Sequence, residues 1–300
     1  MRQITSIVCG VFLIGLQGCS PQYEPSHIDE VGDQYEIRFK QTTQTTGEGS
    51  TGRSTSNNVL VERVISKADN GVELEFDLPK ATPDEYREKE WIYPVRVSRS
   101  WDGTLRLTNE PELEARLSLW LDAGGIDRSA CGKWLFTWTA VKIECDPKSA
   151  LHNISAFDMR AQNIKEGASY TQAGGLGEST IQLDTAGSGT LFVDLPINPA
   201  DVRAQRAESD VIVAEIMGPE TITIEEALQN RESEKISGSL NIQFKVDPRG
   251  QLIERVTTSS LVIQNAEGEE ERLITKTTLT RALIGGPTFD REQVQSDKPT

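Results

Sequence analysis

The side chains that could carry catalysis do not form a familiar catalytic pattern. No Ser is followed three residues later by Lys, so the S-x-x-K arrangement of penicillin-binding enzymes is absent. Ser188 lies between Gly187 and Gly189, without the G-x-S-x-G spacing of a nucleophile elbow. His152 has no nucleophile tied to it by sequence, so a surface or core histidine is the simpler interpretation. Carboxylate pairs for polymer hydrolysis depend on distances in the fold, and that alternative stays open.

Metal and cofactor chemistry has equally little support. The chain has only two His, and no stretch supplies a cluster of metal-type ligands or the alternating oxygen ligands of an EF-hand. Gly174-Gly175-Leu176-Gly177 lacks the third glycine and the preceding strand of a dinucleotide-binding loop. We therefore expect no metal, no cofactor and a non-catalytic protein.

The large aromatic side chains are concentrated in one part of the chain. All five Trp and two of the five Tyr lie between Tyr86 and Trp138. One interpretation is an apolar or sugar-stacking pocket, and the other is a core in which a helix packs on a strand. The pocket would be built from Trp91, Tyr93, Trp101, Trp120, Trp134 and Trp138.

The first residues have the features of an export signal. Arg2 supplies a positive charge, and an uncharged apolar run follows from Ile7 to Leu16. A transmembrane helix needs about 20 apolar residues, about twice the length of this run. The segment is therefore typical of the apolar part of a signal peptide.

The run ends in Leu16-Gln17-Gly18-Cys19, which resembles the lipobox of bacterial lipoprotein precursors. The resemblance implies cleavage after Gly18, diacylglycerol on the Cys19 thiol and acylation of the new amino group, and such chains anchor a protein stably. Ser20 stands where Asp would signal inner-membrane retention, which favours the outer membrane, facing the periplasm. The implied partners are the membrane, through the lipid, and the machinery that processes and sorts lipoproteins.

Cysteine parity then points to a disulfide. Cys9 would leave with the signal and Cys19 would carry lipid, so Cys131 and Cys145 remain. An even pair in an oxidising compartment predicts a disulfide, with two separate buried thiols as the alternative. Their spacing differs from C-x-x-C, so we do not expect a redox role.

Charge separates this chain from proteins that bind polyanions. Lys and Arg number 31 against 46 Asp and Glu, which gives a net charge of -15 over 300 residues. Such a surface repels nucleic acid and anionic lipid headgroups, so no nucleic-acid partner is expected. A hydrophobic share of 36% is enough for a substantial core.

Period-2 alternation predicts strands in the first third of the chain. Tyr35, Ile37 and Phe39 alternate with charged residues, and Asp69-Asn70-Gly71 predicts a tight hairpin. The polar stretch from Thr43 to Asn58 has no apolar residue, which predicts either a mobile loop or a polar extension of a sheet edge.

Alternation also dominates the last third. Residues 240–246, 251–264 and 272–283 predict an antiparallel meander with one face in water. Shorter strands are expected at 134–138, 181–183, 191–195 and 211–216.

Helical spacing occurs in a few places. Asn109 and Pro111 predict the start of an amphipathic helix that Gly124-Gly125 ends. Further short helices are expected from Asn198-Pro199 and from Thr223, where Glu226 would complete a capping box.

These patterns predict a mainly β (α+β) fold, with a curved, open antiparallel sheet or half-barrel and one to three short helices. We assign residues 1–18 to the signal peptide, 19–33 to a polar tether, 34–284 to a β-rich periplasmic domain of one or two subdomains, and 285–300 to a disordered tail.

At fold level, this organisation is similar to the open half-barrels of lipoprotein carriers, which hold acyl chains between a curved sheet and helices. No residue motif supports the analogy. We expect a lipid-anchored binding protein for a hydrophobic or lipid-like ligand, or for an apolar segment of a partner. The alternative is a scaffold that docks an envelope protein by strand addition, and a hydrolase of cell-wall or exported polymers ranks third.

Overall fold

The structure is a computed structural model. It describes residues 29–47, 50–136, 140–160, 164–184, 189–217, 222–248 and 250–285. The predicted signal peptide, Cys19 and Trp138 lie outside the described residues. No helix in these ranges is long and apolar enough to cross a bilayer.

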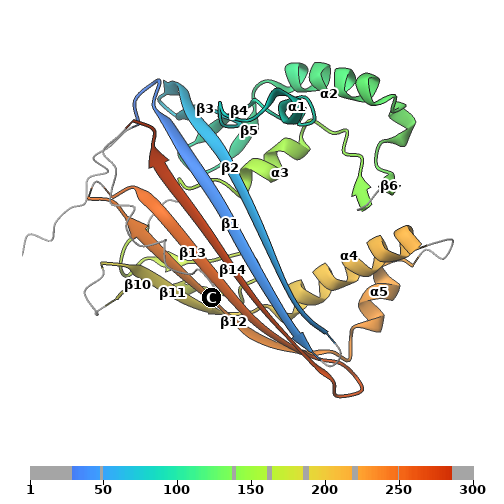
Figure 1. The fold of residues 1–300 in the computed structure, drawn as a ribbon. Coiled ribbons are helices and arrows are strands. Elements are labelled where there is room, and N and C mark those ends of the chain that lie inside the picture. Colours follow the sequence, from blue (N-terminus) through green and yellow to red (C-terminus); the bar gives the residue numbers. More distant parts are fainter. Residues whose placement is uncertain are drawn as a thin grey trace, which may run out of the picture.

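One antiparallel sheet of ten strands organises the described residues, in the order β10-β11-β12-β13-β14-β1-β2-β3-β4-β5 (Figure 1). The first and last strands of the sequence meet in its middle, because β14 pairs with β1. The sheet stays open, which confirms the predicted fold class. Its strands are β1 (Gln34–Gly47), β2 (Ser50–Ala68), β3 (Gly71–Asp77), β4 (Val95–Ser100), β5 (Leu105–Leu107), β10 (Gln182–Leu183), β11 (Leu191–Pro196), β12 (Lys235–Val246), β13 (Leu252–Gln264) and β14 (Glu270–Leu283).

Alternation along the strands separates an inner face, covered by helices and loops, from an outer face. Tyr35 and Ile37 of β1 are buried on the inner face. Arg38, which lies between Ile37 and Phe39, is exposed. The apolar side chains gather at the two flanks of the sheet, and the central strands carry hydroxyl groups between them. The buried flank residues include Leu74, Phe76, Val95 and Val97 on one side and Val193, Ile242 and Phe244 on the other.

The polar stretch from Thr43 to Asn58 belongs to the sheet rather than to a loop. β1 extends to Gly47 and β2 begins at Ser50, so the second of the two predicted alternatives is correct. Among the described residues, β2 pairs with β1 along this stretch but with β3 only from Val61 onward. The strand therefore has a free edge of about ten residues next to the helical part of the molecule.

Five α-helices occur in the described ranges, more than the one to three that the sequence predicts. α1 and α3 are too short to leave a periodic pattern. The predicted helix after Asn109 is present, and Gly125 ends it in the left-handed conformation with φ 61°. The helices are α1 (Asp84–Arg87), α2 (Glu110–Gly124), α3 (Ser149–Ser155), α4 (Pro199–Met217) and α5 (Ile224–Asn230).

The predicted strand at 211–216 is wrong, because these residues form the last turns of α4. Val211, Ile212 and Val213 are β-branched, but the helix that starts at Pro199 continues through them. Only Ala207 of α4 is fully buried, so its apolar residues left no clear helical pattern in the sequence. The predicted capping box of Thr223 and Glu226 is confirmed at the start of α5.

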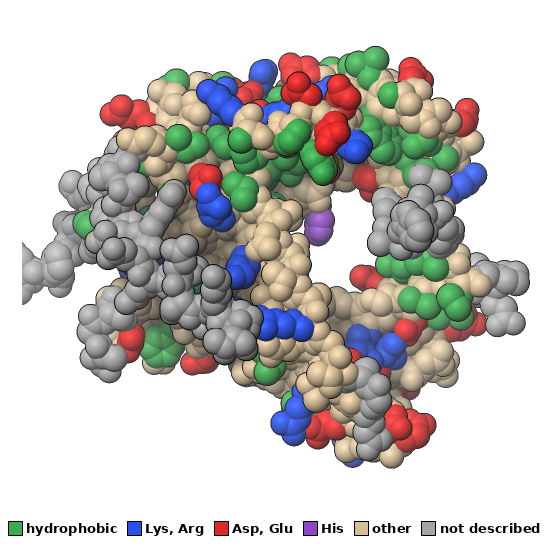
Figure 2. All heavy atoms as spheres, in the orientation of Figure 1, with side chains coloured by type: hydrophobic (Ala, Val, Ile, Leu, Met, Phe, Trp, Pro, Cys, Tyr) green, Lys and Arg blue, Asp and Glu red, His purple; other side chains and the backbone are tan. Residues whose placement is uncertain are grey.

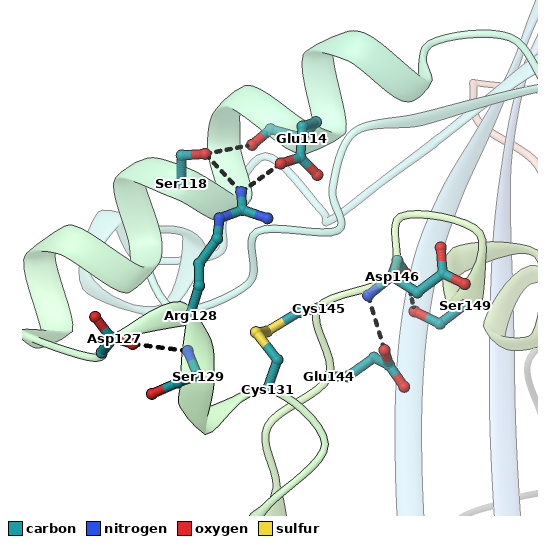
Figure 3. The surroundings of a disulfide bond; sticks show 10 residues. All are labelled: Glu114, Ser118, Asp127, Arg128, Ser129, Cys131, Glu144, Cys145, Asp146 and Ser149. Atoms are coloured by element: carbon teal, nitrogen blue, oxygen red, sulfur yellow. Dashed lines mark hydrogen bonds and ion pairs between the residues drawn. A yellow bond between two sulfur atoms is a disulfide. The ribbon is translucent and has the colours of Figure 1, made fainter.

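A disulfide between Cys131 and Cys145 confirms the predicted pair, with an S–S distance of 2.03 Å (Figure 3). It lies at the base of a hairpin of β6 (Trp134–Phe136) and β7 (Ala140–Lys142). Nearby, Arg128 donates a hydrogen bond to Ser118 Oγ of α2 at 2.9 Å. The base of the hairpin is thus fixed both covalently and to α2. A second small sheet pairs β8 (Ser169–Tyr170) with β9 (Ser179–Thr180).

The last residues of the predicted tether pack against the domain. Asp29 is buried, and the N–H of Gly32 donates to the Val64 carbonyl at 2.9 Å. The ordered part therefore begins before the predicted boundary at residue 34.

Candidate ligand-binding cleft

A cavity of about 400 Å³ opens between the inner face of the sheet and α3. Figure 2 shows that the molecule is hollowed between the part that carries α2 and α3 and the part that carries α4. Concave sites of this size, mainly apolar with a few polar groups, commonly bind small ligands. The apolar lining is Phe39, Val59, Leu60, Leu78, Ala156 and Phe157, and the polar lining is Asn58, Glu90, Tyr93, His152 and Asn153.

The sheet forms one wall through β1 and β2. In their antiparallel register Phe39 lies opposite Asn58 and Ile37 lies opposite Leu60. Side chains two residues apart in a strand share a face, so Phe39 and Ile37 both point inward. Ile37 and Leu60 are buried at the base of this wall, whereas Phe39 is only half-buried and can contact a ligand.

The turn between α1 and β4 supplies Glu90 and Tyr93. The N–H of Tyr93 donates to the Glu90 carbonyl at 3.2 Å, and Arg116 of α2 donates to the carbonyl of Trp91 at 3.0 Å. Burial raises the pKa of the Glu90 carboxyl group. Burial, and secondarily the charge of Glu90, raises the pKa of Tyr93 to about 12, so this phenol is neutral at physiological pH.

The opposite wall is α3 and the residues that follow it. The ring of Phe157 lies 5.8 Å from that of Phe39, at an angle of 49°. Two arginine–carboxylate contacts fasten this segment to the sheet: Arg99 Nε lies 2.9 Å from Asp158 Oδ2, and Arg160 contacts Glu62. These contacts fix the position of Phe157 at the cavity.

Glu62 is the centre of a buried ion cluster, formed by Asp29, Glu62, Arg160 and Arg281. Its fully buried carboxylate lies 2.6 Å from Arg160 Nη2 and 2.8 Å from Arg281 Nη2, and both arginines also contact Asp29. Burial opposes ionisation of both carboxyl groups, but the two guanidinium groups outweigh it. They lower the pKa of Asp29 to about 2 and that of Glu62 below its usual range. Each charge of this cluster is paired within the cluster. Because Arg160 belongs to the segment that carries Phe157, the cluster holds this wall of the cavity in place.

The disulfide hairpin bridges the hollow. Trp134 of β6 donates its indole N–H to Glu215 Oε2 of α4 at 3.0 Å. β6 follows the α2 part of the molecule, and α4 lies on the other side of the hollow (Figure 1). The contact therefore connects the two parts across the hollow, at the end away from the sheet.

Of the six predicted pocket aromatics, Trp138 lies outside the described residues, and the structure does not bring the other five together. Tyr93 lines the cavity, but Trp91 is buried beneath the surface, and Trp120 packs against the core. Trp101 is 49% exposed and donates to a backbone carbonyl at 2.8 Å, whereas Trp134 contacts α4. The core interpretation therefore describes Trp91 and Trp120 better than the pocket interpretation does.

Most of the lining carried no signal in the sequence. Phe39 was predicted to point inward, but nothing local showed that Glu90, Asn153 and Ala156 would meet it. His152, interpreted from the sequence as a surface or core histidine, is exposed, and it also lines the cavity. These residues meet only because α3 folds back over the sheet.

The described residues contain no group of three or more His, Cys, Asp or Glu side chains that could hold a metal ion. Glu90 and His152 are the titratable acid and base among the described lining residues, together with the phenol of Tyr93. The lining holds no Ser, Thr or Cys that could act as a nucleophile in the described ranges.

No protein-family model matches this chain, and no curated protein matches it either. Among solved structures, one of lipid–protein interactions in lipovitellin aligns with a TM-score of 0.40 and 9% identity, over 87% of this chain and 26% of that chain. This chain thus spans about a quarter of the lipovitellin chain.

Two further structures align with lower scores. The dehydratase domain from the CurJ module of curacin polyketide synthase has a TM-score of 0.11 and 8% identity, over 81% of this chain and 75% of that chain. The 12:0-ACP thioesterase from Umbellularia californica has a TM-score of 0.08 and 12% identity, over 84% and 74%. We draw no functional argument from similarities of this size.

Proposed function

We propose that this protein is a lipid-anchored envelope protein, attached through Cys19, that binds a hydrophobic or lipid-like ligand in the cleft between the sheet and α3. The observation that carries the proposal is the cavity of about 400 Å³, whose lining combines the apolar side chains of Phe39, Leu60 and Phe157 with several polar side chains. The apolar chain of a ligand would contact the apolar side chains, and its polar end would remain at the rim of the cavity. Each buried methylene group would contribute about 0.8 kcal/mol.

Filling the cavity tests this proposal. The mature chain from Ser20 onward retains every described residue and can be purified from the periplasm without the lipid anchor. We expect native mass spectrometry, followed by denaturing extraction, to show a co-purifying lipid-like molecule. Ala156→Trp places an indole among the lining side chains and should lower the bound fraction at least tenfold.

Ala123→Trp is the matched control, because Ala123 is exposed on α2 and does not line the cavity. It should retain the ligand at the level of the unmodified protein. Equal occupancy in both variants would show that the ligand binds elsewhere. A protein that carries nothing, and that binds no added lipid, would contradict the proposal.

One observation favours a second candidate function. The free edge of β2 between Ser50 and Leu60 presents unpaired backbone groups among the described residues, as in proteins that bind an extended segment by strand addition. A scaffold role would use this edge to dock another envelope protein. An empty cavity, together with crosslinks from residues 51–58 to a partner, would favour it.

A further inference from the structure

Glu90 is the carboxylate among the described lining residues, and it is partly exposed to solvent without an ion pair. No Lys or Arg of the described residues lies within ion-pair distance of the Glu90 carboxylate. Partial burial raises the pKa of this group, and no neighbouring cation opposes the effect. By contrast, the buried carboxylates of Asp29 and Glu62 are each paired with two arginines. Glu90 therefore differs from the carboxylates that stabilise the fold.

Aromatic rings lie in the same cavity. Phe39, Tyr93 and Phe157 are all in its lining, and the rings of Phe39 and Phe157 are tilted by 49°. The faces of aromatic rings attract cations within about 6 Å of the ring centre, and quaternary ammonium groups are recognised in this way. A carboxylate beside several rings is thus a suitable environment for an organic cation.

The rest of the lining does not favour an anion. The described lining residues include neither Lys nor Arg. The basic side chain at the same level of the inner face is Arg255, which pairs with Leu279, the partner of Phe39. It therefore lies two strands away, at a backbone distance of about 10 Å.

We propose that the cavity binds an organic ammonium group attached to an apolar chain. The Glu90 carboxylate acts as the counter-ion, and the three rings contact the cation and the first carbons of the chain. This inference rests on the proposed function and specifies its ligand class. A lipid with an amine headgroup and a free alkylammonium compound share this chemistry.

Three probes with the same ten-carbon chain test the charge preference: decyltrimethylammonium, decanol and decanoate. Calorimetric titration of the chain from Ser20 onward, at pH 8 and about 0.15 M salt, measures their affinities while salt screens general attraction to the acidic surface. We expect the cation to bind at least tenfold more tightly than decanol, and decanoate to bind more weakly than decanol.

Glu90→Gln should remove the tenfold preference and leave the affinity for decanol within twofold. Glu88→Gln is the matched control, because it removes the same charge two residues away, outside the described lining, and should leave the preference intact. Equal loss in both variants would reduce the preference to general surface charge and overturn the inference.

Two results separate this inference from the proposed function. If decanol and decanoate bind as tightly as the cation, the charge preference is wrong but the cleft still binds apolar chains. If none of the three probes binds, the proposed function fails and the inference fails with it. An excess of phosphatidylethanolamine over phosphatidylglycerol in the extracted material would identify a lipid as the source of the amine.

Discussion

Asp29 connects the start of the ordered chain to the centre of the sheet. Its carboxylate contacts Arg160 and Arg281, which lower its pKa to about 2 from 3.8 despite its burial. A carboxyl group whose folded pKa is depressed stabilises the fold above its unfolded pKa and loses that effect as the pH falls toward the folded value. The shift corresponds to about 2 kcal/mol, which we expect to disappear between about pH 5 and pH 2.

Urea unfolding at several pH values measures this effect. Asp29→Asn should lower the free energy of unfolding at pH 7 by about 2 kcal/mol or more, because it leaves Arg160 and Arg281 with Glu62 alone. The free energy of unfolding of Asp29→Asn should also fall less steeply between pH 5 and pH 2 than that of the unmodified protein. Glu36→Gln is the control, since Glu36 pairs on the outer face with an Arg38 side chain that is 57% exposed, and it should change stability by less than about 1 kcal/mol. Parallel pH profiles for the unmodified protein and Asp29→Asn would contradict the assignment.

Residues of this cluster show why charged positions were hard to predict. Glu62 is charged and fully buried, at an inner-face position where the alternation pattern predicts an apolar side chain. Its partners Arg160 and Arg281 are 98 and 219 positions away in sequence. A buried charge depends on oppositely charged partners, here distant in sequence, and the periodicity of one strand does not predict such partners.

At the scale of elements, two glycines of the sheet make a matched test of backbone packing. A Cβ atom on Gly238 of β12 would lie 2.2 Å from the Ser260 carbonyl oxygen and 3.1 Å from Ile197. Nothing lies within 4 Å of a Cβ atom on Gly52 of β2. Gly238→Ala should therefore destabilise by about 1–3 kcal/mol, because the strands must separate.

Gly52→Ala should be neutral within about 0.5 kcal/mol, or slightly stabilising, since it restricts only the unfolded chain. The urea midpoints of the two variants give the comparison. Equal midpoints would show that β12 and β13 do not approach as closely as the structure indicates.

Elements with a local signal were predictable, and those that depend on distant packing were not. The hairpin after Asp69, the helix after Asn109 and the last three strands follow from turn residues and periodicity. The start of α4 at Pro199 was predicted as well, but its length was not, because only Ala207 of its residues is fully buried. The pairing of β14 with β1 joins the first and last described strands, and no local pattern encodes such a pairing.

At the scale of the whole molecule, the proposed anchor at Cys19 limits how far the cleft can lie from the membrane. About ten residues separate Cys19 from Asp29, and an extended chain of that length reaches at most about 35 Å. Asp29 is held by the buried ion cluster, and the same cluster fastens the segment that carries Phe157. An acylated Cys19 would thus keep the cavity within reach of the bilayer that could supply an apolar ligand.

Substitution of the two N-terminal cysteines tests the anchor in living cells. With labelled palmitate in the medium, we expect the unmodified protein and Cys9→Ala to incorporate label, because Cys9 would leave with the proposed signal peptide. Cys19→Ala should incorporate none and should migrate as the longer, uncleaved precursor, since it lacks the thiol that we propose as the acceptor of diacylglycerol. Acyl chains confined to Cys19 would place the cleft at the membrane surface. Label that persists in Cys19→Ala would contradict lipidation at this position, and the cleft would then have to obtain its ligand without a fixed distance to the membrane.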